Sequence, residues 1–395
     1  MSTLNDVVIN KLSGGLGRRT PEQDMVSGLL FDGKPLAKLE LDKVERLASL
    51  EDAEALGITE GYDSESQSVY YQVQQFFRMN PSGDLYIMKT KASSGADDDI
   101  AASYEDIAGK ALDMQEKANG NIRQMAIIHA GPTTFAQTLA AVATAQTQAN
   151  LAYTDYMPFE VILEGKGFNV EDAASLAELN AENVSVVVAM DVEKAVLYPD
   201  SAAVGLALGA ISKAKVSENI AWIEKFNLTG EGFAKAGFVG GEEVKTLGTL
   251  SDLNEKRYIF ARTHTGLPGV YFNDSSTCTT GTSDFAYVEN NRTINKATRL
   301  LRTALLPKLA SPVLVDIDGK LPQSVSKSFE GLCRSALEAM VANQEVSDFD
   351  VYVDPKQNIL ATSELKVKAE ITPIGTARKI MVDLGFKNPF GIDKA

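Results

Sequence analysis

The two histidines are the first residues that could do chemistry. His129 follows an apolar run in AIIHAGPTTFAQ, and His264 lies in RTHTGLPG. A Ser-His-Asp or Cys-His enzyme, or a histidine-based metal site, would have to use one of them, because the sequence contains only 2 histidines. His129 is expected at the carboxyl end of a parallel strand, where α/β enzymes carry reactive groups. No acid or nucleophile can be paired with either residue from the sequence, so a structural hydrogen bond is the favoured interpretation of both.

The only acidic triplet is a second candidate. Asp97, Asp98 and Asp99 occur in KASSGADDDI. Adjacent carboxylates can collect a hard cation, but this spacing matches no calcium loop, and consecutive side chains point in different directions. A solvated loop, or a cap for a helix that begins near residue 102, is the favoured interpretation.

A glycine-rich stretch and two cysteines complete the candidates. SGGLGRR, near the N-terminus, lacks the Gly-Lys-Ser/Thr and the preceding βα unit of a phosphate loop, so we interpret it as a hinge. Cys278 and Cys333 are too few for a disulfide framework, and nothing around them suggests a metal site. The sequence therefore predicts no catalytic residue, no cofactor site and no metal site.

A basic helix is more informative than any of these. Arg292, Lys296 and Arg299 stand at i, i+4 and i+7 and share one helical face, and Arg302 follows on the same helix. No acid is spaced to neutralise them within the helix, in a chain whose formal net charge is -15. Two interpretations stay open: a solvated face or pairing with the acidic remainder of the chain, and contact with an acidic patch on a partner.

The overall composition excludes several classes of protein. The acidic balance argues against wholesale binding to nucleic acid or to an anionic membrane, because both need a basic footprint. The N-terminus shows no basic head followed by an apolar core, and no run of about 18 apolar residues could span a membrane. We therefore expect a protein made and folded in the cytoplasm, without nucleic-acid binding or membrane insertion.

The pattern of elements predicts two domains. Apolar strands alternate with helices up to about residue 265, which indicates an α/β domain with a largely parallel sheet covered on both faces. The expected strands are 25–31, 84–89, 123–128, 158–163, 184–190 and 257–262, and the expected helices are 102–118, 133–151, 171–178, 200–213 and 217–227. Asp32-Gly33 is expected to form a hairpin-type turn. Beyond a boundary near 265–270, helices 291–306 and 324–343 precede strands 349–353, 364–371 and 379–384, an α+β grouping.

Each end of the chain carries a strand-like run on a hinge. Neither run has a local hairpin partner, so each is suited to completing the sheet of a neighbour. One such arm at each end fits a subunit that links to more than one neighbour in an open helical assembly. The expected arm residues are Asp6, Val7, Val8, Ile9, Leu12, Lys379, Ile380, Met381, Val382 and Leu384, and the expected hinges are Gly14, Gly15, Gly17, Pro373 and Gly375.

Several blocks of the sequence resemble a known family. The clearest block is 257–309, with GLPGVYFNDSSTCTTGTSDFAYVENNR and TALLP, and EITPIGTARKIMVDLGF follows near the end. KVERLASLEDAEALGI and QQFFRMNPSGDLYIM match more weakly. These blocks are similar to the sheath proteins of contractile phage tails and related contractile injection systems, in the version found in tail-like elements of Bacteroides-type bacteria.

The resemblance implies a mechanical function. Such sheaths stack as hexameric rings around an inner tube and contract to drive the tube through a cell envelope, while their terminal arms add strands to sheets of adjacent subunits. It implies an N-terminal arm and hinge (1–24), an α/β outer domain (25–265), an α+β inner domain (266–373) and a C-terminal arm (374–395). The implied partners are copies of the chain, the inner tail tube, the baseplate and the tail-terminator proteins. With these partners, the basic face of Arg292, Lys296, Arg299 and Arg302 is expected to contact the tube or an adjacent subunit. The protein would be made in the bacterial cytoplasm and become part of a tail or injection particle.

Two other functions remain open at this point. A cytosolic α/β enzyme could use a cleft near His129, at the end of its strand. A non-contractile structural tube protein would also polymerise, but its polymers would have only one length state.

Overall fold

A six-stranded sheet organises the first two thirds of the chain in the structure, a computed structural model that describes residues 23–91, 103–243 and 245–387. The strand order is β2-β3-β1-β4-β5-β6, and all neighbours are parallel except β2 and β3. The strands are β1 (Val26–Phe31), β2 (Val44–Leu47), β3 (Asp84–Lys89), β4 (Gln124–Ile128), β5 (Glu160–Glu164) and β6 (Val184–Val187). Five of them lie where the sequence pattern predicts apolar strands, because runs such as QMAII are buried on both faces.

The sheet corrects one local expectation. Asp32-Gly33 does not form a hairpin, because β1 pairs in parallel with both β3 and β4. Leu29, for example, lies opposite Ile87 on one side and Ala126 on the other. The chain must therefore cross over the sheet after β1, and Asp32 is left at the carboxyl end of a central strand.

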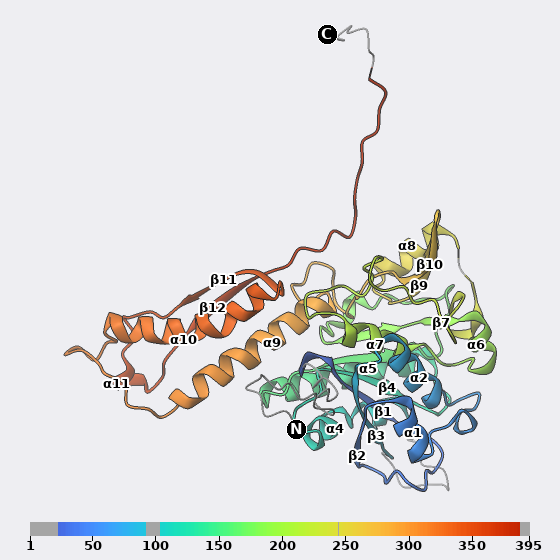
Figure 1. Cartoon of the computed structure of the whole chain (residues 1–395), viewed down its shortest axis with the longest axis horizontal. Coiled ribbons are helices and arrows are strands. Elements are labelled where there is room, and N and C mark those ends of the chain that lie inside the picture. The colour runs from blue at the N-terminus through green and yellow to red at the C-terminus, as the bar shows by residue number, and fades with distance from the viewer. Residues whose placement is uncertain (1–22, 92–102, 244, 388–395) are drawn as a thin grey trace, which may run out of the picture.

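Helices cover both faces of the sheet (Figure 1). One layer contains α2 (Val69–Met79) and α7 (Val204–Lys213), with α1 (Leu50–Leu56) beside α2. The other contains α5 (Phe135–Thr154), α3 (Tyr104–Ala108) and α4 (Ala111–Lys117). The backbones of α2 and α7 approach closely because Gly205 faces Gln72, where a Cβ atom would lie 2.1 Å from the carbonyl oxygen.

The end of the α/β region differs most from the sequence expectation. Residues 171–178 are not a helix, and only a short 3-10 turn follows (Ala177–Leu179). Residues 217–227 form turns in place of a helix, because Asn219 is committed to buried polar partners elsewhere in the chain. The expected strand 257–262 meets the sheet only through a bridge from Ile259 to Val187. The other elements here are β7 (Ala189–Asp191), α6 (Val192–Leu197), β8 (Ala236–Phe238), α8 (Leu247–Glu255), β9 (Ala261–His264) and β10 (Leu267–Phe272).

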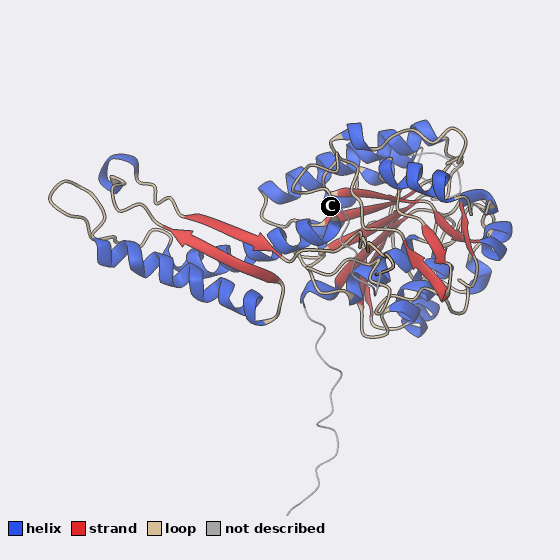
Figure 2. Cartoon of the chain, turned by 90° about the horizontal axis from the view of Figure 1, so that it is seen from above, coloured by secondary structure: helices blue, strands red, loops and turns tan. Residues whose placement is uncertain are grey.

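A second unit projects from the α/β region (Figure 2). Helices α9 (Val288–Leu305) and α10 (Gln323–Ala342) pack against each other, and α10 packs on β11 (Val346–Tyr352). β11 pairs antiparallel with β12 (Lys368–Pro373), and a short helix, α11 (Ile359–Thr362), lies between them. We call residues 288–373 the projecting unit. Its own apolar cores are small and include Ala297, Cys333, Leu337, Met340 and Val351 in one cluster and Leu321, Phe329 and Val353 in another.

The large core of the α/β region continues beyond the expected boundary. Val270, Phe272, Cys278 and Val288 all belong to it. Residues 266–287 therefore pack with the α/β region, and we include them in what we call the α/β unit (residues 23–287). The functional division into outer and inner domains stays a prediction.

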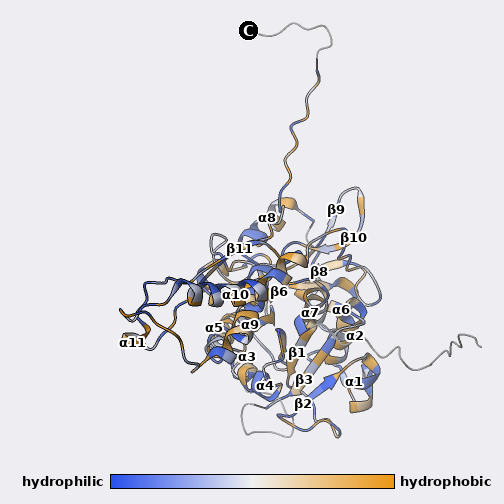
Figure 3. Cartoon of the chain, turned by 60° about the vertical axis from the view of Figure 1, so that its left-hand side comes forward, coloured by the Kyte–Doolittle hydropathy of each residue, from blue (hydrophilic) through white to orange (hydrophobic). Residues whose placement is uncertain are grey.

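The C-terminal segment leaves the projecting unit without pairing. Residues 374–387 contain no helix or strand, and Figure 3 shows this segment running away from the body with hydrophobic residues along it. The strand expected at 379–384 thus has no partner within the described chain. The N-terminal arm residues and the hinge glycines 14, 15 and 17 lie outside the described residues. No helix in the described part of the chain is long and apolar enough to cross a membrane.

Candidate functional site

Helix α9 joins the projecting unit to the α/β unit through its basic residues. Arg292 is only 4% exposed, although it is charged. Its guanidinium donates to the carbonyl oxygens of Ala214 (3.2 Å), Lys215 (3.3 Å) and Asp24 (3.1 Å). A buried guanidinium needs such acceptors to offset its lost hydration. Arg292 is thus a structural residue that fastens the first turns of α9 to the α/β unit.

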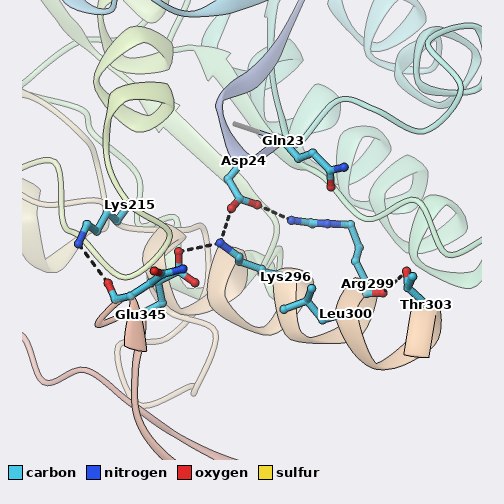
Figure 4. A pocket seen from close by; sticks show the side chains of 9 residues that line it. Gln23, Asp24, Lys215, Lys296, Arg299, Leu300, Thr303 and Glu345 are labelled. Carbon is cyan, nitrogen blue, oxygen red and sulfur yellow. Dashed lines mark hydrogen bonds and ion pairs between the residues drawn. The ribbon is translucent and has the colours of Figure 1, made fainter. Parts of the chain in front are cut away.

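The next basic residues converge on one carboxylate. Lys296 Nζ lies 2.6 Å from Asp24 and 2.6 Å from Glu345, and Arg299 Nη2 lies 2.7 Å from Asp24 (Figure 4). Burial opposes ionisation of Asp24, but the charges of Lys296 and Arg299 outweigh it and lower its pKa. A surface pocket of about 580 Å³ lies beside this cluster, between the two units.

These contacts show that the basic residues of α9, which we call the basic stripe, pair within the chain. Arg302 also has a partner in the chain, since its guanidinium lies 3.5 Å from the ring centroid of Tyr156. All four basic residues therefore face the α/β unit, as in the interpretation of pairing within the chain. The neutralising acids that the helix itself lacks are supplied by Asp24 and Glu345, from elsewhere in the chain. A direct role for the basic residues in binding a tube or a neighbouring subunit stays a prediction.

A buried glutamate adds a polar contact between the units. Glu160, at the start of β5, accepts hydrogen bonds from Asn183 (3.1 Å), Asn291 (3.2 Å) and Asn295 (2.9 Å), the last two on α9. Burial raises the pKa of Glu160 to about 8, although these amide donors and Arg292 oppose the rise. The folded chain therefore holds a proton there at neutral pH, when the unfolded chain has released it.

This proton makes stability depend on pH. A raised carboxyl pKa contributes stability at low pH that is lost as the pH rises towards 8, with a slope of up to about 1.4 kcal/mol per pH unit. We expect Glu160→Gln to remove about 1 kcal/mol of the fall in unfolding free energy between pH 7 and pH 8. Urea unfolding at the two pH values measures this. Glu178→Gln, at an exposed position, is the control, and equal slopes in both variants would contradict the assignment.

The C-terminal segment and the small sheet offer complementary features. Ile380, Val382, Leu384 and Phe386 are 78–110% exposed, and alternate residues of an extended chain share one side. The sheet of the projecting unit has only two strands, so β11 and β12 each have an edge that pairs with no strand in the described residues. Unpaired edges bind extended segments readily. Pro373 ends β12, and Gly375 follows in the unpaired segment.

Comparisons with known proteins identify the family of this chain. Two family models match, one described as the DUF2586 N-terminal domain over residues 4–276 and one as the DUF2586 C-terminal domain over residues 284–391. The chain belongs to the DUF2586 family. No curated protein matches it in sequence.

Solved structures similar to this DUF2586 chain are sheath proteins. The helical sheath of the anti-feeding prophage in its contracted state is 14% identical, with a TM-score of 0.64, and the match covers 98% of this chain and 100% of that one. The contracted sheath complex of the extracellular contractile injection system PVC is 11% identical (TM-score 0.63, 98% of both chains). The sheath tail protein of Desulfitobacterium hafniense is 12% identical (TM-score 0.56, 93% of this chain and 100% of that one). The sheath resemblance seen in the sequence is thereby confirmed as a shared fold.

The His129 region of the DUF2586 chain is filled by its own side chains. The strand order reverses between β1 and β4, the point where doubly wound enzymes open their active sites. Here Asp32 and His129 close that point with a 2.8 Å contact between Oδ2 and Nδ1, and they are 0% and 2% exposed. Tyr104 stacks on the imidazole, and Lys166 Nζ donates to the His129 carbonyl oxygen at 2.7 Å. Sequence reasoning missed Asp32 because 97 residues separate it from His129.

The Asp32–His129 pair is expected to stabilise the fold. The second oxygen of Asp32 accepts the backbone N–H of Ala130 at 2.7 Å, so removing the carboxylate leaves two buried groups without this acceptor. We expect Asp32→Ala to lower the unfolding free energy by about 3 kcal/mol, measured by urea unfolding. The exposed control Asp172→Ala should change it by less than about 0.5 kcal/mol. Unchanged stability in Asp32→Ala would show that the pair has no structural importance.

The remaining candidates show no chemistry. His264 is partly exposed beside Tyr271, and burial together with Arg262 lowers its pKa. Cys278 and Cys333 are free and buried. Within the described ranges, no group of three or more His, Cys, Asp or Glu side chains could hold a metal ion. The acidic triplet 97–99 lies outside the described residues.

Proposed function

We propose that the chain is the subunit of a contractile sheath, which polymerises around an inner tube and contracts to drive it through a cell envelope. The observation that carries the proposal is the match in fold over 98% of this chain and 100% of a sheath subunit. The work is mechanical: the subunits pass between two packings of different free energy, and no covalent step is involved. Copies of the chain in stacked hexameric rings are the principal partner.

The arms connect the copies. An exposed apolar segment (379–386) and a two-stranded sheet with free edges are the two halves of a strand-addition contact. In the proposed assembly, the C-terminal arm of one subunit pairs with the β11–β12 sheet of a neighbour, and the N-terminal arm (5–12) occupies the other edge. Backbone pairing at the arms keeps subunits joined while the globular parts rotate.

The predicted outer and inner domains, whose boundary differs from that between the α/β unit and the projecting unit, take different places in the particle. We assign residues 25–265 to the outer wall and 266–373 to the inner domain that faces the tube, with 1–24 and 374–395 as the arms. A further similar structure is that of the anti-feeding prophage baseplate, which supports a baseplate as one partner of the sheath. The inner tube and a tail-terminator protein complete the set. The subunit would be made in the bacterial cytoplasm and incorporated into a virion tail or an injection particle.

Negative-stain microscopy tests the proposal. The full-length protein, produced together with its proposed tube protein, is expected to form hollow tubes that shorten and widen after mild acid or urea. Uniform small particles, with a melting temperature that shifts on ligand addition, would support the enzyme alternative. Tubes of a single length that never shorten would support a non-contractile tube protein.

A further inference from the structure

Helix α9 carries an acidic residue and several basic residues at different positions along its axis. The acidic residue binds a residue near the C-terminal end of the described chain, and the basic residues bind one near its N-terminal end. Glu289 lies in its first turn, and Arg292, Lys296 and Arg299 lie one to three turns later. The first site holds Arg378, which begins the C-terminal arm. The second holds Asp24, two positions after the N-terminal residues 1–22.

Arg378 is seated in a socket of buried acids. Its Nε lies 2.9 Å from Asp274 Oδ2, and its Nη2 pairs with Glu289 Oε1. Asp274 and Glu289 are only 6% and 3% exposed. The guanidinium lies 3.4 Å from the ring centroid of Tyr287, so it is bound by charge on its edge and by an aromatic face.

The socket is held in place by further side chains. Asn219 Nδ2 donates to Asp274 and Glu289, and Ser275 donates its hydroxyl hydrogen to Glu289. These donors fix the carboxylates in the geometry that a planar guanidinium requires, which a lysine ammonium would not reproduce. The segment that follows Pro373 is thus attached to the rest of the molecule at its fifth residue, Arg378. The apolar residues of the C-terminal arm begin two positions later, at Ile380.

Asp24 is the corresponding fixed point at the other end. Its carboxylate pairs with Lys296 and Arg299, and its carbonyl oxygen accepts from Arg292. Lys296 extends the contact to Glu345, the residue directly before β11. Side chain and backbone are therefore both attached to α9 at the point where residues 1–22 join the described chain.

We propose that α9 is the tie between the two arms, with Asp24 and Arg378 as their anchors. Glu289 and Lys296 are seven residues apart, about 10 Å along a helix that rises 1.5 Å per residue. Tension between the arms would pass through this length of helix, and Asp274 of the α/β unit would share the load at Arg378. The inference rests on the proposed sheath function, and it adds which residues carry the load inside one subunit.

The anchors can be tested in the isolated subunit. A nitroxide label at Ala377→Cys or Gln23→Cys reports the motion of each arm base, since the two native cysteines are buried. We expect Arg378→Gln to free the first label and Asp24→Asn the second, with about a tenfold rise in the mobile population, within the range measured for coupled neighbours. Arg334→Gln, which breaks an exposed pair with Asp350, is the matched control and should free neither label. Unchanged mobility in Arg378→Gln and Asp24→Asn would overturn the anchors.

The tie is tested in assembled sheaths. Wild-type sheaths should contract intact, whereas sheaths of Arg378→Gln or Asp24→Asn should break into rings or short pieces, or fail to assemble, under the same trigger. Arg378→Lys, which keeps the charge and protects the fold, should lie between them because it loses the planar fit. Intact contraction of sheaths with both anchors removed would overturn the tie. If the wild type forms no sheath while the labels respond as expected, the proposed function fails and the anchors remain.

Discussion

A chain truncated after Arg378 should fold normally and form no sheath. The truncation removes every residue of the exposed arm beyond its anchor, and these residues have no partner strand in the described chain. The unfolding free energy should therefore stay within about 0.5 kcal/mol of wild type, since the described residues that are lost, 379–387, are exposed. Polymers seen by microscopy should disappear, because each subunit lacks one of its two strand contacts.

Point substitutions can show that the arm acts as a strand. Replacing Ile380, Val382 and Leu384 by Asp places negative charges on one side of the extended segment. A neighbour's sheet would then have to bury these charges. This triple variant should lose polymers as the truncation does. Val196→Asp, on the exposed face of α6 in the α/β unit, is the matched control and should assemble. Deleting residues 1–20 should give soluble monomers too; sheath-like polymers from that deletion would sink the strand-exchange model.

Arg292→Glu should have the largest effect on stability of any change in the basic stripe. The new carboxylate would be buried beside the carbonyl oxygens of residues 24, 214 and 215, with no donor in place of the guanidinium. Breaking a buried charged contact in this way costs about 3–5 kcal/mol, a large share of the stability of an ordinary domain. Urea or thermal unfolding, with circular dichroism, measures the loss.

The control for this substitution lies just after the same helix, in the 3-10 turn Leu306–Lys308. Lys308→Glu reverses charge at an exposed position and should change stability by less than about 0.5 kcal/mol. Arg292→Glu with wild-type stability but impaired binding to the tube would favour the external contact over the internal one. Loss of assembly caused by Arg292→Glu is otherwise uninformative about the tube, because the subunit itself is damaged.

The sequence predicts the α/β sheet well where burial is complete. Short, mostly apolar runs such as DLYIMK and QMAII indicate buried strands, and β3 and β4 lie there. The helices at 171–178 and 217–227 failed because local periodicity does not reveal tertiary polar contacts. Asn219, for example, serves the Arg378 socket, a demand set by residues far along the chain.

The site was hard to predict for the same reason. Arg299 pairs with a carboxylate 275 positions away, and nothing in the spacing around either residue announces the pair. The helical face of Arg292, Lys296 and Arg299 could be recognised from its period, but its partner could not. The one available signal was the acidic balance of the remaining chain, which made pairing within the chain a reasonable interpretation.

The small sheet of the projecting unit limits how many strands a subunit can accept from its neighbours. It has two strands, and each has an edge that pairs with no other strand in the described residues, while the two proposed arms are strands to donate. In the proposed assembly, every subunit inside the lattice gives two strands and receives two, so no edge is left open there. The numbers of donated and accepted strands are equal only for interior subunits. The first and last rings must keep unpaired sheet edges or unpaired arms. Subunits could thus continue to add at either end until a protein of different structure pairs with the remaining edges or arms. A sheath built in this way therefore needs a different partner protein at each end.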